Sequence, residues 1–133
     1  MQLELRRLLS GQEYPGIGSI RSELEAFCDA NRLPCPSRAT IYNFMARARC
    51  ETHAAADLPP SVRNALYNLR GDAQVPGSQL AFYCFNYGDL TAAHFAAGLP
   101  WLALYQAARM RGWRPKCEGL LRAALATRRI GRA

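Results

Sequence analysis

The segment Leu33-Pro-Cys-Pro-Ser37-Arg-Ala-Thr-Ile-Tyr-Asn-Phe-Met-Ala-Arg-Ala-Arg49 predicts a proline-stiffened turn that leads into a helix. Ser37 stands at the N-cap position, where a side-chain oxygen can accept a hydrogen bond from a first-turn N–H. Proline is tolerated before a helix but not inside one. The apolar residues then follow helical spacing at Ile41, Phe44, Met45 and Ala48. We therefore expect a helix from Ser37 to about Cys50 with one apolar stripe.

The opposite face of this expected helix carries small and polar side chains, and the whole segment lacks an acidic residue. Asn can pair with adenine and Arg with guanine in the major groove, and small residues let the backbone approach closely. We expect Asn43 and Arg47 to read base edges, Arg38 and Arg49 to contact phosphates, and Thr40 to lie at the groove. The alternative is an ordinary amphipathic helix whose Arg face is solvated.

A second helix is expected just before this one. Ser19 can cap it, and Ile20, Leu24, Phe27 and Cys28 form its apolar stripe up to about Asn31. Two helices of this kind, with the second presented by a tight turn, predict a helix-turn-helix.

The residues Pro36-Ser-Arg-Ala-Thr-Ile-Tyr-Asn-Phe-Met45 resemble the second helix of helix-turn-helix domains in bacterial regulators and recombinases. In those proteins a Pro-Ser-x-x-Thr-[Ile/Val]-Tyr pattern opens the recognition helix. The resemblance is direct over residues 36–45, extends to the preceding helix, and fixes no single family. It implies DNA binding, with Arg38, Thr40, Asn43 and Arg47 at or near the groove.

The positive charge is concentrated at the C-terminal end. The formal net charge is +7, yet residues 1–108 hold nine Arg and nine acidic residues. Residues 109–133 hold eight basic residues and one acid, Glu118. Arg suits bidentate contacts to phosphate, so we expect Arg109, Arg111, Arg114 and Lys116 to contribute to DNA binding. A solvated tail, or a coding sequence that favours Arg, would produce the same excess.

The rest of the chain predicts further short helices. They are expected at residues 2–10, 60–69, 78–87, 89–97, 100–111 and 116–129, with caps at Ser78 and Asp89. Residues 51–58 are expected to form a linker, and a small β-wing is allowed near residues 70–77. The predicted fold is all-α: a compact bundle of about six or seven short helices. Residues 1–50 would form the helix-turn-helix module and residues 59–133 a C-terminal helical module with a basic tail, and the two could pack as one domain.

The length and hydrophobic composition of the chain restrict the classes of protein to which it can belong. The chain has 133 residues, half of them hydrophobic, and no apolar run long enough to cross a bilayer. Its first residues lack the apolar core of a secretory signal. We expect a cytoplasmic protein without a membrane partner.

Catalytic and metal motifs are not recognisable. The five cysteines include no Cys-x-x-Cys pair, which favours free, buried thiols. Cys28, Cys35, Cys50 and His53 suggest zinc ligands, but their spacing fits no standard zinc site. Neither His53 nor His94 lies in a nucleophile motif. We expect no enzyme activity, no metal and no cofactor.

The most direct hypothesis is a small transcriptional regulator that binds double-stranded DNA through residues 37–50, with homodimerisation as a reasonable addition. Two alternatives stay open. One is a helical protein-interaction or adaptor module without a nucleic-acid role. The other is a non-specific nucleic-acid accessory protein that uses the C-terminal Arg cluster, acting on RNA or single strands.

Overall fold

The computed structural model describes residues 2–67 and 71–128. Within these ranges the chain is mostly helical, as predicted, and it adds a small sheet of two strands. The elements are α1 (Gln2–Leu9), α2 (Ile17–Asn31), α3 (Arg38–Arg47), β1 (Thr52–Ala54), the short 3-10 helix η1 (Ala55–Asp57), α4 (Pro60–Ala65), β2 (Gln74–Pro76), α5 (Gly77–Tyr87), α6 (Leu90–Ala97), α7 (Trp101–Ala108) and α8 (Pro115–Thr127).

The described residues form eight α-helices, slightly more than the expected total of about six or seven, and they correspond one to one to the helical ranges expected from the sequence. Gly88 and Pro100 separate the apolar stretch from residue 77 to residue 108 into three distinct helices. At Gly88 a Cβ atom would lie 2.5 Å from the Cβ of Ala92 and 2.6 Å from the carbonyl oxygen of Cys84. The chain therefore turns between α5 and α6 at a point where only glycine fits.

The expected linker at residues 51–58 was also wrong, because it contains β1 and η1. β1 pairs antiparallel with β2, with His53 opposite Val75. The β-wing allowed near residues 70–77 thus corresponds to β2, but its partner strand lies in the supposed linker. Three-residue strands leave almost no periodic signal in a sequence. Residue 70, at the start of the range expected to hold the wing, and residues 68–69, at the end of the expected helix at 60–69, lie outside the described part of the chain.

Several helix ends differ from the sequence prediction. α2 begins at Ile17 after Gly16, which has a φ of 93°, so Ser19 lies inside the helix and does not cap it. α3 ends at Arg47 and not near Cys50, because Ala48 adopts an extended conformation. α5 begins at Gly77 with no side-chain cap from Ser78. α8 begins at Pro115, one residue early, and its predicted end at Arg129 lies outside the described residues.

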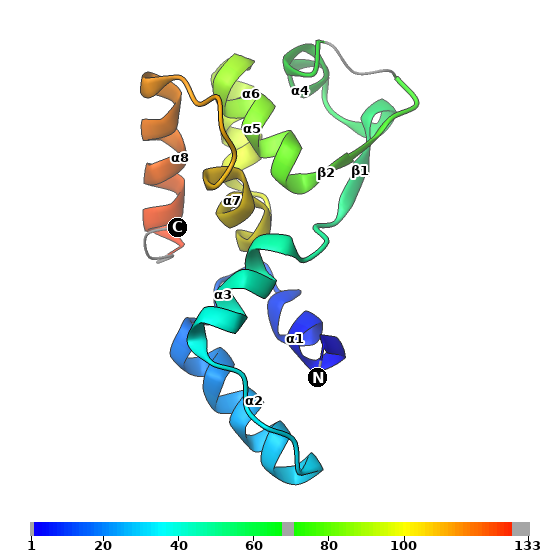
Figure 1. The fold of residues 1–133 in the computed structure, drawn as a ribbon. Coiled ribbons are helices and arrows are strands. Elements are labelled where there is room, and N and C mark those ends of the chain that lie inside the picture. The colour runs from blue at the N-terminus through cyan, green and yellow to red at the C-terminus, as the bar shows by residue number, and fades with distance from the viewer. Residues whose placement is uncertain (1, 68–70, 129–133) are drawn as a thin grey trace.

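The helices form a larger part and a smaller part that pack against each other (Figure 1). α5 and α7 pack at the centre of the larger part, with α4, α6 and α8 around them. α1, α2 and α3 form a smaller part below it, whose interior contains Leu5, Leu9, Ile20, Leu24, Cys28, Ile41 and Met45. Buried side chains from both parts belong to one continuous hydrophobic core.

The loop between α1 and α2 fastens the two parts together. The N–H of Trp101 donates to the carbonyl oxygen of Gln12 at 3.1 Å, and the ring of Tyr14 packs against the ring of Trp101 at 4.8 Å. Trp101 is fully buried at the start of α7. The N-terminal helices are therefore docked on the central helix of the larger part.

Candidate nucleic-acid interface

The start of α3 has the cap that the sequence predicts. The Ser37 side chain accepts a hydrogen bond from the backbone N–H of Thr40 at 3.2 Å. The two hydroxyl groups of Ser37 and Thr40 also lie 3.0 Å apart, within hydrogen-bond distance. The Thr40 hydroxyl thus contacts the cap, and the Thr40 side chain remains exposed to solvent.

The two faces of α3 divide as the spacing of apolar residues predicts. Ile41 and Met45 are fully buried, and Asn43 and Arg47 are exposed on the opposite side, whereas Arg38 is exposed in the first turn on a flank of the helix. Asn43 and Arg47 are one helical turn apart, so their side chains share a surface. Among the described residues, no carboxylate forms an ion pair with Arg38 or Arg47. This face presents polar and cationic groups to solvent without a competing acid.

The connection between α2 and α3 is longer than a tight turn. Arg32 to Ser37 join the helices, beginning with Arg32 in the left-handed conformation at φ 55°. The N–H of Leu33 then donates to the carbonyl oxygen of Cys28 at 2.8 Å, and the chain runs back beside α2 before α3 begins (Figure 1). A helix-turn-helix joins its two helices by three or four residues. Two prolines in the connection explain its extended course, since each fixes φ and disfavours a helical predecessor.

The end of α3 is held by a side chain that sequence reasoning missed. The Gln106 amide on α7 donates to the carbonyl oxygens of Met45 at 2.8 Å and Ala48 at 2.6 Å. Its own oxygen accepts from the Cys50 thiol at 2.9 Å. Helix ends leave carbonyls without intrahelical partners, and Gln106 supplies two of those partners from another helix. The available signal was a lone polar residue inside the apolar helix Trp101–Ala108.

The segment between α7 and α8 brings basic side chains close to aromatic rings. The Arg109 guanidinium lies 6.0 Å from the Tyr105 ring, and the Arg114 guanidinium lies 4.6 Å from the Tyr87 ring. Arg109, Arg111, Arg114 and Lys116 are all exposed. Trp113 instead closes the end of α7, because its indole N–H donates to the carbonyl oxygen of Ala107 at 2.9 Å.

Other basic residues of the C-terminal cluster are used within the protein. Arg128 donates to the carbonyl oxygens of Gln12 at 2.7 Å and Ala97 at 3.0 Å, and its side chain is only 12% exposed. Arg122 pairs with Glu118 at 2.8 Å. Arg128 therefore links α8 to the loop after α1 and is not a free phosphate contact. Residues 129–133, which include two more Arg, lie outside the described residues.

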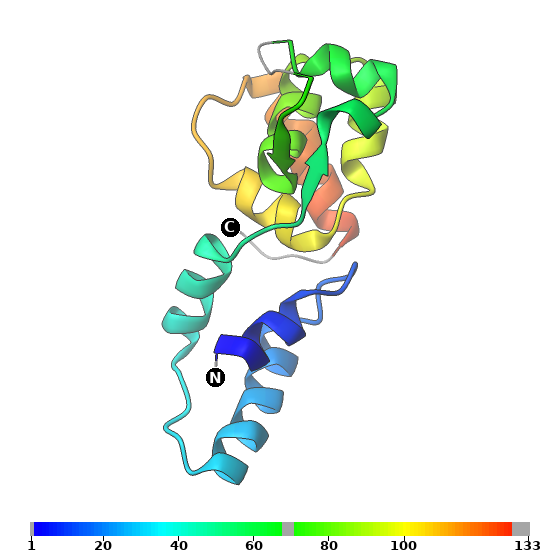
Figure 2. The ribbon, with the colours of Figure 1, turned by 90° about the vertical axis from the view of Figure 1, so that its right-hand side faces the viewer.

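α3 and the segment at residues 109–114 lie along the same side of the molecule, the left edge in Figure 2. In that view the other N-terminal helices lie to the right of α3. α3 and the segment that carries the exposed Arg109 and Arg111 therefore lie along one side of the molecule. Arg114 and Lys116 lie farther along, where the segment enters α8.

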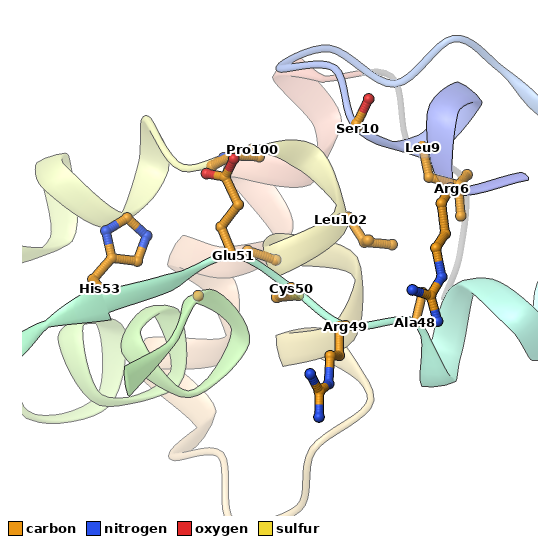
Figure 3. A pocket seen from close by; sticks show the side chains of 12 residues that line it. Arg6, Leu9, Ser10, Ala48, Arg49, Cys50, Glu51, His53, Pro100 and Leu102 are labelled. Carbon is orange, nitrogen blue, oxygen red and sulfur yellow. The ribbon is translucent and has the colours of Figure 1, made fainter. Parts of the chain in front are cut away.

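A pocket of about 230 Å³ lies where the N-terminal helices meet the rest of the chain (Figure 3). Its apolar wall includes Leu9 and Leu102, and its rim includes Arg6, Arg49 and Glu51. Arg49 follows the end of α3 on an extended segment, so it is not on the helix as predicted. Of the DNA-contact residues predicted from sequence, it alone lines this pocket.

All five cysteines lie in the described residues and none of them forms a disulfide, but only two are buried as predicted. Cys28 and Cys84 are buried, Cys35 is exposed, and Cys50 and Cys117 are half-buried. Burial raises the pKa of Cys84 to about 12, which keeps it a neutral core group at ordinary pH. Within residues 2–67 and 71–128 no cluster of side chains is suited to hold a metal ion. In the same ranges no helix has the length and apolar character needed to cross a membrane.

Comparisons with protein-family models, with curated proteins and with solved structures found no match for this chain.

Proposed function

We propose that the protein binds double-stranded DNA through the exposed face of α3. The observation that carries this proposal is an acid-free helix face that shares one side of the molecule with exposed arginines of the segment at residues 109–114. A helix of this width fits the major groove, and the flanking cations can neutralise phosphates.

Within this proposal the side chains divide into two roles. Asn43 and Arg47 contact base edges, because they lie one turn apart on the outermost face of α3. Arg38, Arg49, Arg109 and Arg111 contact phosphates, which fix the position of the helix on the duplex. Thr40 contacts the cap through its hydroxyl and lies exposed near the groove-facing residues. The hydrogen bonds from Gln106 on α7 to the end of α3 keep this helix in one position relative to the arginines of the 109–114 segment.

A transcriptional regulator in the cytoplasm is the biological role that fits such binding best. One helix in one groove gives limited affinity, so a homodimer that places two copies of α3 on neighbouring half-sites is part of the proposal. The long connection between α2 and α3 means that the docking angle of α3 need not match that of a standard helix-turn-helix.

Binding to a fluorescein-labelled random-sequence duplex, measured by anisotropy over a series of salt concentrations, tests this function. We expect binding at low salt whose logarithmic affinity falls linearly with the logarithm of the salt concentration. The variant Arg109→Gln with Arg111→Gln should weaken binding to all sequences alike and reduce the salt slope by about one for each phosphate contact that is lost. No binding at low salt would refute the proposal and leave the adaptor hypothesis.

A further inference from the structure

Three tyrosines form an interlocked cluster at the surface, which we call the tyrosine surface: Tyr67, Tyr83 and Tyr87. The Tyr67 ring stands edge-on to the Tyr83 ring at 6.4 Å and to the Tyr87 ring at 5.5 Å. The Tyr83 and Tyr87 rings lie 5.8 Å apart. Edge-to-face packing of this kind favours defined ring positions. Tyr67, just after α4, is thus held by two rings of α5.

The cluster leaves a large aromatic area in water. Tyr67 is 68% exposed and Tyr87 is 37% exposed. Single exposed apolar residues are common on protein surfaces, but contiguous aromatic rings are a feature of binding surfaces. The Tyr67 ring therefore offers a pre-positioned, accessible aromatic face.

Positive charge lies directly beside these rings. The Arg114 guanidinium stacks on Tyr87, and the Arg114 backbone N–H donates to the side-chain oxygen of the buried Asn86 at 3.0 Å. Lys116 is exposed two residues later. Among the carboxylates of the adjoining segments, Glu118 pairs with Arg122, and Asp89 accepts from the N–H of Ala92 as the cap of α6. The surface therefore combines aromatic rings with the cations of Arg114 and Lys116.

This surface is separate from the face of α3. α4 and the start of α8 lie at the end of the molecule opposite α2, the upper end in Figure 1, whereas α3 lies in the lower half. The segment at residues 109–114 runs between the two regions. A ligand on the tyrosine surface need not touch Asn43 or Arg47.

We propose that the tyrosine surface binds single-stranded nucleic acid. An unpaired base stacks on Tyr67, and adjacent phosphates contact Arg114 and Lys116. Stacking on aromatic side chains beside basic residues is how proteins hold single strands without sequence preference. The charge favours this occupant over a peptide, because a polyanion gains from both cations, which a neutral apolar peptide cannot use. This binding is independent of the proposed reading of duplex DNA by α3.

The test is the affinity of the full chain for a fluorescein-labelled twelve-nucleotide oligothymidine, measured by anisotropy at low salt. We expect the native protein to bind and Tyr67→Ala to weaken binding about tenfold, since one stacked base is commonly worth about that factor. Tyr67→Phe should bind like the native protein, because the ring is retained. Leu90→Ala is the control, because it removes an apolar side chain that is 83% exposed and lies outside the ring cluster. It should leave the affinity for the oligonucleotide unchanged.

Charge and independence are checked in the same assay. Arg114→Gln should weaken binding of the oligonucleotide and flatten its salt dependence. Asn43→Ala with Arg47→Ala should leave that binding intact, so failure of duplex recognition and failure of this inference are distinguishable. Absence of oligonucleotide binding, or equal binding by Tyr67→Ala and the native protein, would overturn the inference and favour a protein partner on the tyrosines.

Discussion

α7 and α3 are helices of eight and ten residues that meet at Gln106, yet they are buried to very different degrees. α7 buries six side chains (Trp101, Leu102, Ala103, Leu104, Tyr105 and Ala107), whereas α3 buries only Ile41 and Met45. The difference indicates that α7 contributes mainly to the stability of the fold. α3 instead presents an exposed surface, and its two ends are fixed by the Ser37 cap and by Gln106. Substitutions should therefore separate stability from binding according to the helix they are made in.

Removal of a core side chain from α7 should have the largest effect. Leu104 is fully buried among α5, α7 and their neighbours. We expect Leu104→Ala to lower the free energy of unfolding by about 3 kcal/mol, through lost burial and the cavity left behind. Unfolding in urea, followed by far-UV circular dichroism, measures this. If the free energy of unfolding falls only as little as it does for a surface substitution, α7 is not the more stabilising of the two helices.

Removal of the Gln106 side chain, which joins α7 to the end of α3, should have the second-largest effect. Gln106→Ala leaves the carbonyl oxygens of Met45 and Ala48 without their partner, at a cost of about 2 kcal/mol. Hydrogen exchange should show lower protection at the end of α3 than in α5. Gln106→Glu is the matched control, since it keeps the size and the acceptor but loses the two N–H donors. If Gln106→Glu is as stable as the native protein, the donated hydrogen bonds do not hold α3.

Loss of the cap at the other end of α3 should rank third. Ser37→Ala removes the acceptor for the N–H of Thr40 and should cost about 1 kcal/mol. Ser37→Asp keeps an acceptor and adds a favourable charge at the helix N-terminus, so its stability should stay close to that of the native protein. Thermal unfolding of the three proteins gives the order. Equal losses for both variants would mean that the Ser37 hydroxyl is not the cap.

The features that could be predicted from sequence are local ones. Ser37 and Asp89 each cap a helix three residues from the N–H they bind, and Ile41 with Met45 follows from spacing within one helix. The bend at Gly88 is likewise marked by a single residue. Such features need no knowledge of how distant segments pack.

The features that escaped prediction join segments far apart in the chain. Gln106 reaches Met45, Arg128 reaches Gln12, and β1 pairs with β2 across a gap of about twenty residues. Each of these contacts depends on the tertiary arrangement, so the spacing of residues along the sequence does not predict it. The same holds for the candidate site. The exposed residues of α3 follow from periodicity, but the position of the segment at residues 109–114 on the same side of the molecule as α3 could only come from the folded structure.

The most direct test of the central claim compares two double variants in duplex binding and in stability. Asn43→Ala with Arg47→Ala alters the face of α3, and Arg63→Ala with Asn64→Ala alters the same residue types on the exposed side of α4. The account predicts that the α3 variant binds duplex DNA at least about tenfold more weakly at low salt, because lost base contacts cost about 1–3 kcal/mol each. Its free energy of unfolding should stay within about 0.5 kcal/mol of the native value, as for other surface substitutions. Equal duplex binding by the α3 variant, the α4 variant and the native protein would contradict the claim that α3 is the DNA-contacting helix.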